Sequence, residues 1–261
     1  MNAARLRAVP VERVWGRRDI PTGFPRLADD VPVGEIWFEA PAGAGLLVKY
    51  LFTAERLSIQ VHPDDAAAAA RGFPRGKDEA WFVLDAEPGA TIGLGLIRNV
   101  TREELRAAAL DGSIEALLDW RPVARGDVFY SPAGTVHAIG GGIALIEIQQ
   151  NLDLTYRLYD YGRPRELHIE EAASIAIPGP WVPPSPPRAA TPGREILAQG
   201  GAFSLERLTA PAGVRGEAVV VPIAAGGFID GEALEAGSAW SVAESAEIIG
   251  DAIDVLVARP A

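Results

Sequence analysis

Three polar side chains share one face of a predicted strand in the stretch RLSIQVHPDD, residues 56–65. Ser58, Gln60 and His62 alternate there with apolar residues, which is the period of a strand with one apolar face. The polar face offers a hydroxyl, an amide and an imidazole side by side. Imidazole nitrogens and side-chain oxygens bind divalent metals, so this face is a candidate ligand set.

Two further side chains could complete a metal site. His137 follows a strand and a Pro-x-Gly turn in GDVFYSPAGTVHAIG, and Glu79 begins the apolar stretch EAWFVLDA. Two imidazoles, one carboxylate and the Gln60 amide oxygen suit a divalent first-row metal, with water positions left open for catalysis. Each residue taken alone is more often structural, because a histidine near a strand end usually only hydrogen-bonds and a single glutamate is usually solvated.

Composition limits the partners and the ligand types. The chain of 261 residues has a net charge of −11 and no cysteine. Thiolate metal sites and disulfides are therefore excluded. An acidic chain repels nucleic acid and anionic lipid, and no apolar run reaches the roughly 18 residues that span a membrane. The N-terminus lacks the apolar core of a signal peptide, so we expect a cytoplasmic protein with no nucleic-acid or membrane partner.

Lysine is almost absent from the chain. Of 24 basic residues only Lys49 and Lys77 are lysines. An ammonium is a compact charge with three donors, which a guanidinium does not replace in a tight pocket. Composition alone leaves two interpretations open: the two lysines lie on the surface by chance, or they have a role in a pocket.

Most of the chain predicts short strands separated by Gly and Pro, which is typical of a β sandwich or barrel. Two stretches are helical in character: 64–72 begins at an aspartate, and 101–120 begins with a Thr-x-x-Glu capping box. The proline-rich stretch 176–195 predicts an extended linker. The predicted strands are 33–40, 45–54, 56–62, 79–86, 89–96, 126–132, 142–150 and 155–162.

The run Gly-Asp-x-x-x-x-Pro-x-Gly-x-x-His over 126–137 resembles the second motif of the cupin superfamily. The ordered series LSIQVHPDD, GKDEAWFVL, GDVFYSPAGTVHAIGGGIALIEIQQNLDLTYRLYDYGR and RELHIEEA extends the resemblance to type I mannose-6-phosphate isomerase, in its short bacterial form. The motifs VWGRR and VGEIWFEA are similar to that family too. The match runs from about residue 13 to 172, and the C-terminal third matches only in general character.

The resemblance implies a mainly β fold, a cupin double-stranded β-helix (jelly-roll) barrel. We expect a metal-binding domain over 1–175 with a short helical insertion near 101–120. The linker 176–195 would then lead to a smaller, degenerate cupin-like β domain over 196–261. The expected activity is the interconversion of mannose 6-phosphate and fructose 6-phosphate through a cis-enediol, with one Zn²⁺ per chain.

The resemblance also assigns residues. For the zinc it implies the ligands Gln60, His62, Glu79 and His137. For the reaction it implies Arg157, Lys77 and Glu147 as catalytic residues and Lys49 as a further lysine of the active site, which we expect to bind substrate. We add Ser58 as a substrate-binding residue, because it lies beside the ligands on the same strand face. Both lysines of the chain therefore fall in the expected pocket.

One departure from the family concerns the segment QQNLDLT, where Leu152 and Leu154 replace small hydroxyl residues, so the local shape of the pocket is open. His168 is interpreted as structural. Two other functions remain open, an iron(II) cupin dioxygenase and a non-catalytic sugar-phosphate-binding cupin. The expected partner is a small-molecule sugar phosphate, and the expected assembly is a monomer or a homodimer.

Overall fold

The structure is a computed structural model that describes residues 3–28, 30–184 and 189–261. It is mainly β, with 44% of residues in strands and 10% in helices. Within these residues, no helix is long and apolar enough to cross a membrane.

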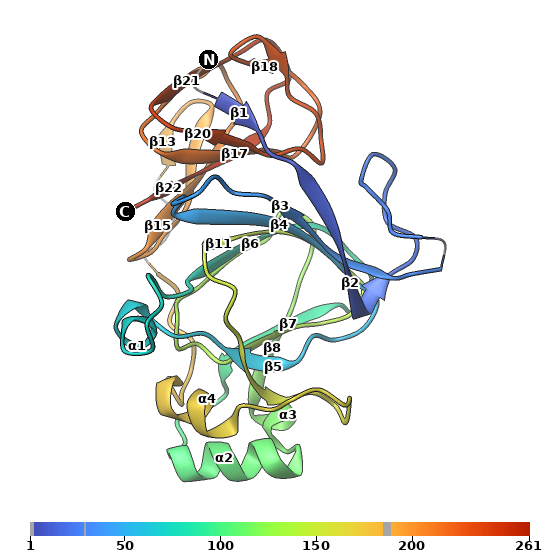
Figure 1. The fold of residues 1–261 in the computed structure, drawn as a ribbon, viewed down its shortest axis with the longest axis vertical. Helices are drawn as coiled ribbons and strands as arrows, with labels where there is room; N and C mark the ends of the chain where they lie inside the picture. The colour runs from blue at the N-terminus through green and yellow to red at the C-terminus, as the bar shows by residue number, and fades with distance from the viewer. Residues whose placement is uncertain (1–2, 29, 185–188) are drawn as a thin grey trace.

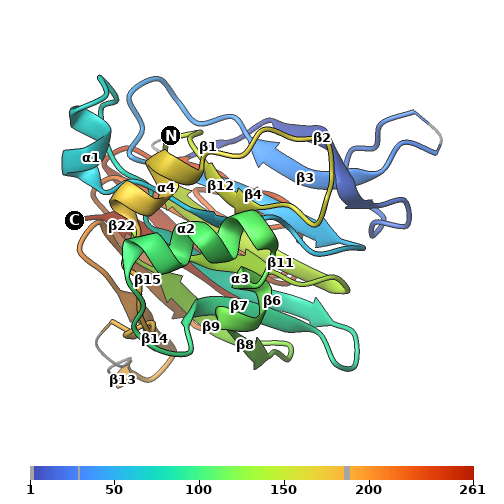
Figure 2. The ribbon, with the colours of Figure 1, turned by 90° about the horizontal axis from the view of Figure 1, so that it is seen from below.

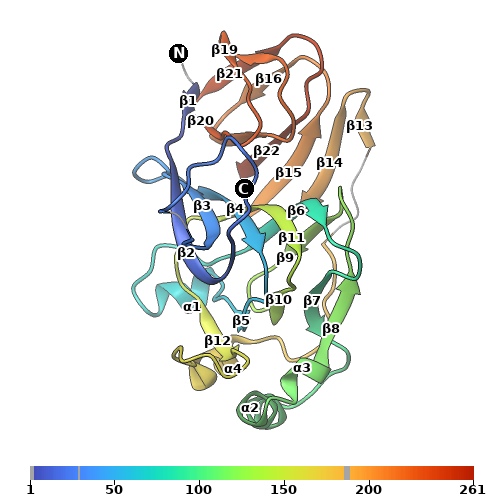
Figure 3. The ribbon, with the colours of Figure 1, turned by 90° about the vertical axis from the view of Figure 1, so that its right-hand side faces the viewer.

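Two sheets face each other in the N-terminal barrel (Figures 1 and 3). The six-stranded sheet has the order β2 (Ala8–Arg17), β3 (Val33–Phe38), β4 (Leu46–Thr53), β11 (Ile143–Gln150), β6 (Glu79–Ala86), β9 (Val128–Ser131). The five-stranded sheet has the order β12 (Tyr156–Tyr159), β5 (Ile59–Val61), β10 (His137–Ile139), β7 (Thr91–Leu96), β8 (Leu118–Pro122).

Two more sheets form the C-terminal unit, at the top of Figure 1. The seven-stranded sheet has the order β1 (Ala3–Arg5), β20 (Trp240–Val242), β17 (Ala218–Pro222), β22 (Val255–Pro260), β15 (Phe203–Leu208), β14 (Arg194–Gln199), β13 (Ala189–Thr191). The four-stranded sheet has the order β16 (Ala212–Arg215), β21 (Ser245–Ile249), β18 (Phe228–Ile229), β19 (Glu232–Ala233).

Strand alternation separates the apolar cores from the barrel interior. On β11, Ile146 and Ile148 belong to a core that also contains Phe203 and Leu256 of the seven-stranded sheet. The alternate residues of β11 face the other way, into the barrel, where Leu145 packs against the five-stranded sheet. Because successive side chains of a strand point to opposite faces, Glu147 shares the barrel face with Leu145.

The helices α2 (Arg102–Asp111), α3 (Ile114–Leu117) and α4 (Ile169–Ile175) cover the outer face of the five-stranded sheet (Figure 2). The helix α1 (Asp65–Ala69) lies to one side of the barrel (Figure 1). Leu105 of α2 and Ala172 of α4 pack against Ile59 and Val61 of β5. This apolar contact turns the alternate residues of that strand, the predicted polar face, toward the barrel interior.

The expected helix over 101–120 is shorter in the structure. Its predicted start is confirmed, since the Glu104 backbone N–H donates to Thr101 Oγ1 at 3.0 Å. Its end comes early because Gly112 adopts φ +83°, the left-handed conformation that ends helices at glycine. The rest of the stretch forms α3 and the strand β8.

The predicted division into 1–175, 176–195 and 196–261 remains a prediction, and some strands cross its boundaries. β1 pairs with β20, so residues 3–5 join the C-terminal sheet. β13 and the start of β14 lie inside the stretch predicted as a linker. Residues 185–188 of that linker lie outside the described residues. Earlier in the linker, the Trp181 indole N–H donates to the Tyr130 carbonyl at 3.0 Å.

Candidate active site

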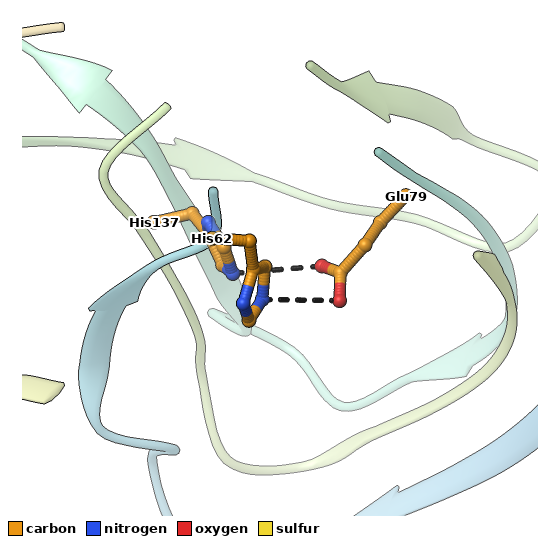
Figure 4. A group of neighbouring side chains, drawn as sticks. All are labelled: His62, Glu79 and His137. Carbon is orange, nitrogen blue, oxygen red and sulfur yellow. Dashed lines mark ion pairs between the residues drawn. The ribbon is translucent and has the colours of Figure 1, made fainter. Parts of the chain in front are cut away.

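Three candidate ligands meet at one end of the barrel interior (Figure 4). His62 follows β5, Glu79 begins β6 and His137 begins β10. Their ligand atoms lie within 4.8 Å of one another, and all three side chains are buried. Cross-strand pairing brings them there, since His137 is the register partner of Gln60, two residues before His62.

Backbone carbonyls orient both imidazoles. His62 Nδ1 lies 2.9 Å from the Leu154 carbonyl oxygen, and His137 Nδ1 lies 2.9 Å from that of Thr135. A carbonyl only accepts, so each Nδ1 carries the proton and each Nε2 is left with a lone pair. The two Nε2 atoms face the Glu79 carboxylate at 3.1 and 3.5 Å.

The Glu79 carboxylate has an ion-pair partner but no hydrogen bond. Lys77 Nζ lies 2.9 Å from its Oε1, and neither buried oxygen has a hydrogen-bond partner among the described residues. Buried polar atoms of this kind are rare unless an ion or water completes them. The orphaned oxygens and two imidazole lone pairs therefore fit a divalent metal.

Electrostatics favour the same protonation states. Burial, together with the Lys77 ammonium, lowers the pKa of His62 to about 3. Burial also lowers the pKa of His137. Burial alone would raise the pKa of Glu79, but Lys77 and His62 outweigh it and hold that pKa well below its usual range. Neutral imidazoles beside an ionised carboxylate are the form in which these groups bind metals.

Gln60 lies next to this cluster, with its amide turned the other way. Its Nε2 is 3.3 Å from His137 Nε2, and its Oε1 accepts from the Ser58 hydroxyl at 3.0 Å. Rotating the amide by half a turn would exchange its oxygen and nitrogen. The oxygen would then face the cluster and the NH₂ would face Ser58, so the fourth-ligand role of Gln60 stays a prediction.

The cluster lies beside a cavity of about 400 Å³, and Glu79 forms part of its wall. The candidate residues that line it come from five different segments: Lys49, Ser58, Gln60, Lys77, Glu79, Glu147 and Arg157. The structure thus brings together every site residue that the sequence analysis assigned, because His62 and His137 contact Glu79 directly. Their individual roles remain predictions.

A buried ion pair also lies in the wall of this cavity. Lys49 Nζ is 3.3 Å from Glu147 Oε1, since the two residues are register partners on β4 and β11. The Trp81 indole N–H donates to the other Glu147 oxygen at 3.1 Å. Burial, with repulsion from Glu79, raises the pKa of Glu147 despite Lys49. Glu147 is therefore a carboxylate that takes up a proton more readily than usual.

Lys77 keeps its proton among these residues. Burial alone would lower the pKa of Lys77, but Glu79 and Glu147 outweigh burial and raise it. The surrounding carboxylates therefore favour its ammonium form.

Arg157 is a cation with few partners. It makes none of the ion pairs found within 4.0 Å among the described residues, and its buried Nε has no hydrogen-bond partner. Burial lowers its pKa. His168 holds the backbone of Arg157 by two hydrogen bonds. The His168 Nδ1 accepts from the Arg157 backbone N–H at 3.3 Å, and the His168 backbone N–H donates to the Arg157 carbonyl. His168 therefore supports β12, as the structural interpretation expects.

The two leucines that depart from the family pattern do not line the cavity. Asp153 and Thr155 line the cavity, whereas the alternating leucines, Leu152 and Leu154, are not among its lining residues. Leu152 is buried, and its carbonyl accepts from Gln149 at 2.8 Å. Leu154 packs against the core beneath the helices. The carbonyl of Leu154, which orients His62, does not depend on the side-chain type.

Five charged residues of the cavity wall were not predicted from the sequence: Glu12, Arg13, Glu35, Asp153 and Arg165. Arg13 pairs with Glu35 at 2.6 Å. Arg165 makes a two-point contact with the buried Asp160, at 2.6 and 2.7 Å. Arg13 directly precedes the motif VWGRR, whereas Glu35 lies in VGEIWFEA and Arg165 in RELHIEEA, and these motifs were used only for the resemblance. The quoted motifs could therefore have pointed to these charged residues, but their approach to the cavity depends on long-range strand pairing.

Comparison with known proteins gives a consistent result. No family model matches the chain. The mannose-6-phosphate isomerase of Streptococcus mutans is 44% identical over 140 residues, which cover 51% of this chain and 44% of that protein. Mannose-6-phosphate isomerase ManA of Bacillus subtilis is 43% identical over 145 residues, covering 53% and 45%. The match thus spans less than half the length of these curated relatives.

Solved structures extend the likeness to the whole fold. The crystal structure of mannose 6-phosphate isomerase from Bacillus subtilis has a TM-score of 0.82 and 25% identity, covering 99% of this chain and 100% of that one. A variant of phosphomannose isomerase from Salmonella typhimurium has a TM-score of 0.76 at 13% identity, which supports the fold alone. The chain is thus similar to mannose-6-phosphate isomerases by sequence over about half its length, and it shares their cupin fold over nearly all of it.

Proposed function

We propose that the protein is a zinc-dependent aldose–ketose isomerase that interconverts mannose 6-phosphate and fructose 6-phosphate. The observation that carries the proposal is the combination of the His62, Glu79 and His137 cluster with a polar cavity beside it. A bound Zn²⁺ would act as a Lewis acid and hold sugar oxygens in a fixed geometry. His62, Glu79 and His137 would hold it, with Gln60 as the expected fourth ligand.

The isomerisation moves one proton between C1 and C2 of the sugar and a second proton between the two oxygens, through a cis-enediol. Glu147 is the better candidate for the base at carbon, because its pKa is raised and it faces the cavity. Lys77, which favours the ammonium form, suits a proton donor to oxygen. Both roles are open to test by separate substitutions.

Arg157 supports the anionic part of the chemistry. Its side chain lines the cavity and makes no ion pair among the described residues, so its charge is available to a substrate. It would stabilise negative charge that develops on the enediolate oxygen. Ser58 and Lys49, which also line the cavity, would contact the sugar phosphate and orient its reacting end.

A coupled assay of mannose 6-phosphate conversion tests the proposal directly. The protein is stripped with a chelator, assayed, and assayed again after Zn²⁺ is returned. Activity that is lost on stripping and restored by zinc is the expected result. Zinc binding without conversion would favour a non-catalytic sugar-phosphate binder, whereas bound iron with oxygen uptake would favour a cupin dioxygenase.

A further inference from the structure

A single carboxylate outside the cavity connects the segments that carry the candidate ligands. Asp78 lies between Lys77 and Glu79, and strand alternation turns its side chain away from the site. Its Oδ1 accepts from the Ala133 N–H at 2.8 Å. Ala133 belongs to the turn 132–135 that leads into His137. The start of β6 and the turn before β10 are therefore tied together by one side chain.

The turn 132–135 also contacts both histidines. The Gly134 N–H donates to the His62 carbonyl at 2.8 Å. The Thr135 carbonyl is the group that accepts from His137 Nδ1. A shift of this turn relative to Asp78 would therefore displace two imidazoles relative to the Glu79 carboxylate. Outer contacts of this kind commonly tune metal affinity, because they fix the orientation of the ligands.

A tyrosine hydroxyl completes the contacts of Asp78. The Tyr130 O–H donates to Asp78 Oδ2 at 2.7 Å, and the Tyr130 side chain is buried. The ring of Tyr130 packs against Phe203 of the C-terminal unit, with the ring centroids 5.0 Å apart. Tyr130 therefore touches the C-terminal unit with its ring and the metal-bearing segment with its hydroxyl.

The turn between β14 and β15 fits tightly over this ring. A Cβ atom on Gly200 would lie 1.9 Å from Tyr130 Cζ and 2.0 Å from its hydroxyl oxygen. Such an approach is far inside contact distance, so only glycine leaves the ring where it is. The neighbouring Gly201 has open space at the same point, with nothing within 4 Å.

We propose that Asp78 and Tyr130 are positioning residues for the metal site, and that the turn of the C-terminal unit at Gly200 holds Tyr130 in place. The C-terminal unit thereby contributes to metal affinity although it supplies none of the candidate ligands. The inference rests on the proposed metal site.

The test measures Zn²⁺ affinity, by competition with a chromogenic chelator, and thermal unfolding of the chelator-stripped protein. Tyr130→Phe keeps the ring and removes the hydroxyl, and is expected to weaken Zn²⁺ binding about tenfold. Tyr50→Phe is the matched control. Tyr50 is equally buried at the same interface, but its hydroxyl donates to the Pro222 carbonyl at 3.4 Å. It should leave Zn²⁺ affinity unchanged.

A second pair of variants tests the C-terminal turn. Gly200→Ala should push the Tyr130 ring aside and weaken Zn²⁺ binding, whereas Gly201→Ala should not. In a Tyr130→Phe background, Gly200→Ala should cost little further Zn²⁺ affinity, because the contact that it disturbs is already gone. Asp78→Asn, which still accepts from Ala133, should retain more affinity than Asp78→Ala.

The outcomes separate the two proposals. A parent protein that binds no Zn²⁺ would overturn the proposed function and this inference with it. A parent that binds Zn²⁺, with Tyr130→Phe and Gly200→Ala binding it equally well, would overturn the inference alone. Lower thermal stability in those variants, at unchanged Zn²⁺ affinity, would also count against it.

Discussion

The barrel and the C-terminal unit have the same architecture, two facing β sheets, but very different interiors. Buried polar residues are frequent in the barrel, whereas beyond residue 195 the described chain buries only Glu206 and Ser238 of this kind. Both have partners: Glu206 pairs with Arg194, and the Ser238 hydroxyl donates to the Glu235 carbonyl.

The polar atoms left without partners differ as well. Around the barrel cavity, both Glu79 oxygens and the Arg157 Nε are buried without a hydrogen-bond partner in the part of the chain that the structure describes. In the C-terminal unit, the Trp240 indole nitrogen is the atom of this type among the described residues. The fold alone therefore does not make a site. The inward positions of a few strands decide whether the space between two sheets becomes a cavity with chemistry or an apolar core.

The largest expected effect follows from removing a barrel ligand. His137→Ala should abolish Zn²⁺ retention and isomerase activity together, since it removes one of two imidazoles from the cluster. Zinc content after dialysis and turnover measure both effects. His168→Ala is the control, because His168 contacts the backbone of Arg157, and the variant protein should keep its zinc. Equal zinc loss in both variants would contradict the assigned ligand set.

Glu147→Gln should reduce kcat by about 10²- to 10⁴-fold, the usual contribution of a general base. The carboxylate form is the active one, so activity of the parent enzyme should fall as pH drops through the pKa of Glu147. Because that pKa is raised, the fall should begin above the pH at which an ordinary glutamate protonates. The pH dependence of kcat/KM checks this, and the acid limb should disappear in Glu147→Gln.

Arg157→Ala should lower turnover by about 10²- to 10³-fold while zinc remains bound. Arg157 lines the cavity but is not part of the ligand cluster, so the substitution should lower the turnover rate without loss of bound zinc. Arg163→Ala provides a comparison, since Arg163 pairs with Asp160 and Glu55 and does not line the cavity. Near-full turnover of Arg157→Ala would show that the assigned role is wrong.

The smallest effect is expected in the apolar interior. Ile248→Val in the C-terminal unit should reduce the free energy of unfolding by about 1 kcal/mol, because it removes one buried methylene from a packed core. Zinc affinity and turnover should not change. Chemical denaturation and the isomerase assay check the two parts, and a large loss of turnover would show that the two interiors are less separate than we describe.

Much of the site could be predicted from local pattern. The alternation of Ser58, Gln60 and His62 placed them on one face, and the packing of Ile59 and Val61 under the helices explains why that face points inward. The Lys49 and Glu147 ion pair could not be predicted in this way. It depends on the register between β4 and β11, which pairs residues almost a hundred positions apart.

Other features were beyond local pattern for similar reasons. The helix over 101–120 carried a correct start signal, but its end depends on the backbone conformation of Gly112. The sequence does not distinguish Asp78 from an ordinary loop residue, because its hydrogen bond with the Ala133 N–H joins residues 55 positions apart. Long-range pairing, more than propensity, therefore limited the prediction of this chain.

The pairing of β1 with β20 has a consequence for the order in which the molecule can assemble. Ala3 pairs with Val242, so β1 finds its partner only after more than 230 further residues have been synthesised. Contacts between such distant residues slow folding, because a long loop must close before the contact forms. The strands of the barrel lie before residue 160, whereas the seven-stranded sheet also needs β20 and β22, so we expect it to be completed later than the barrel.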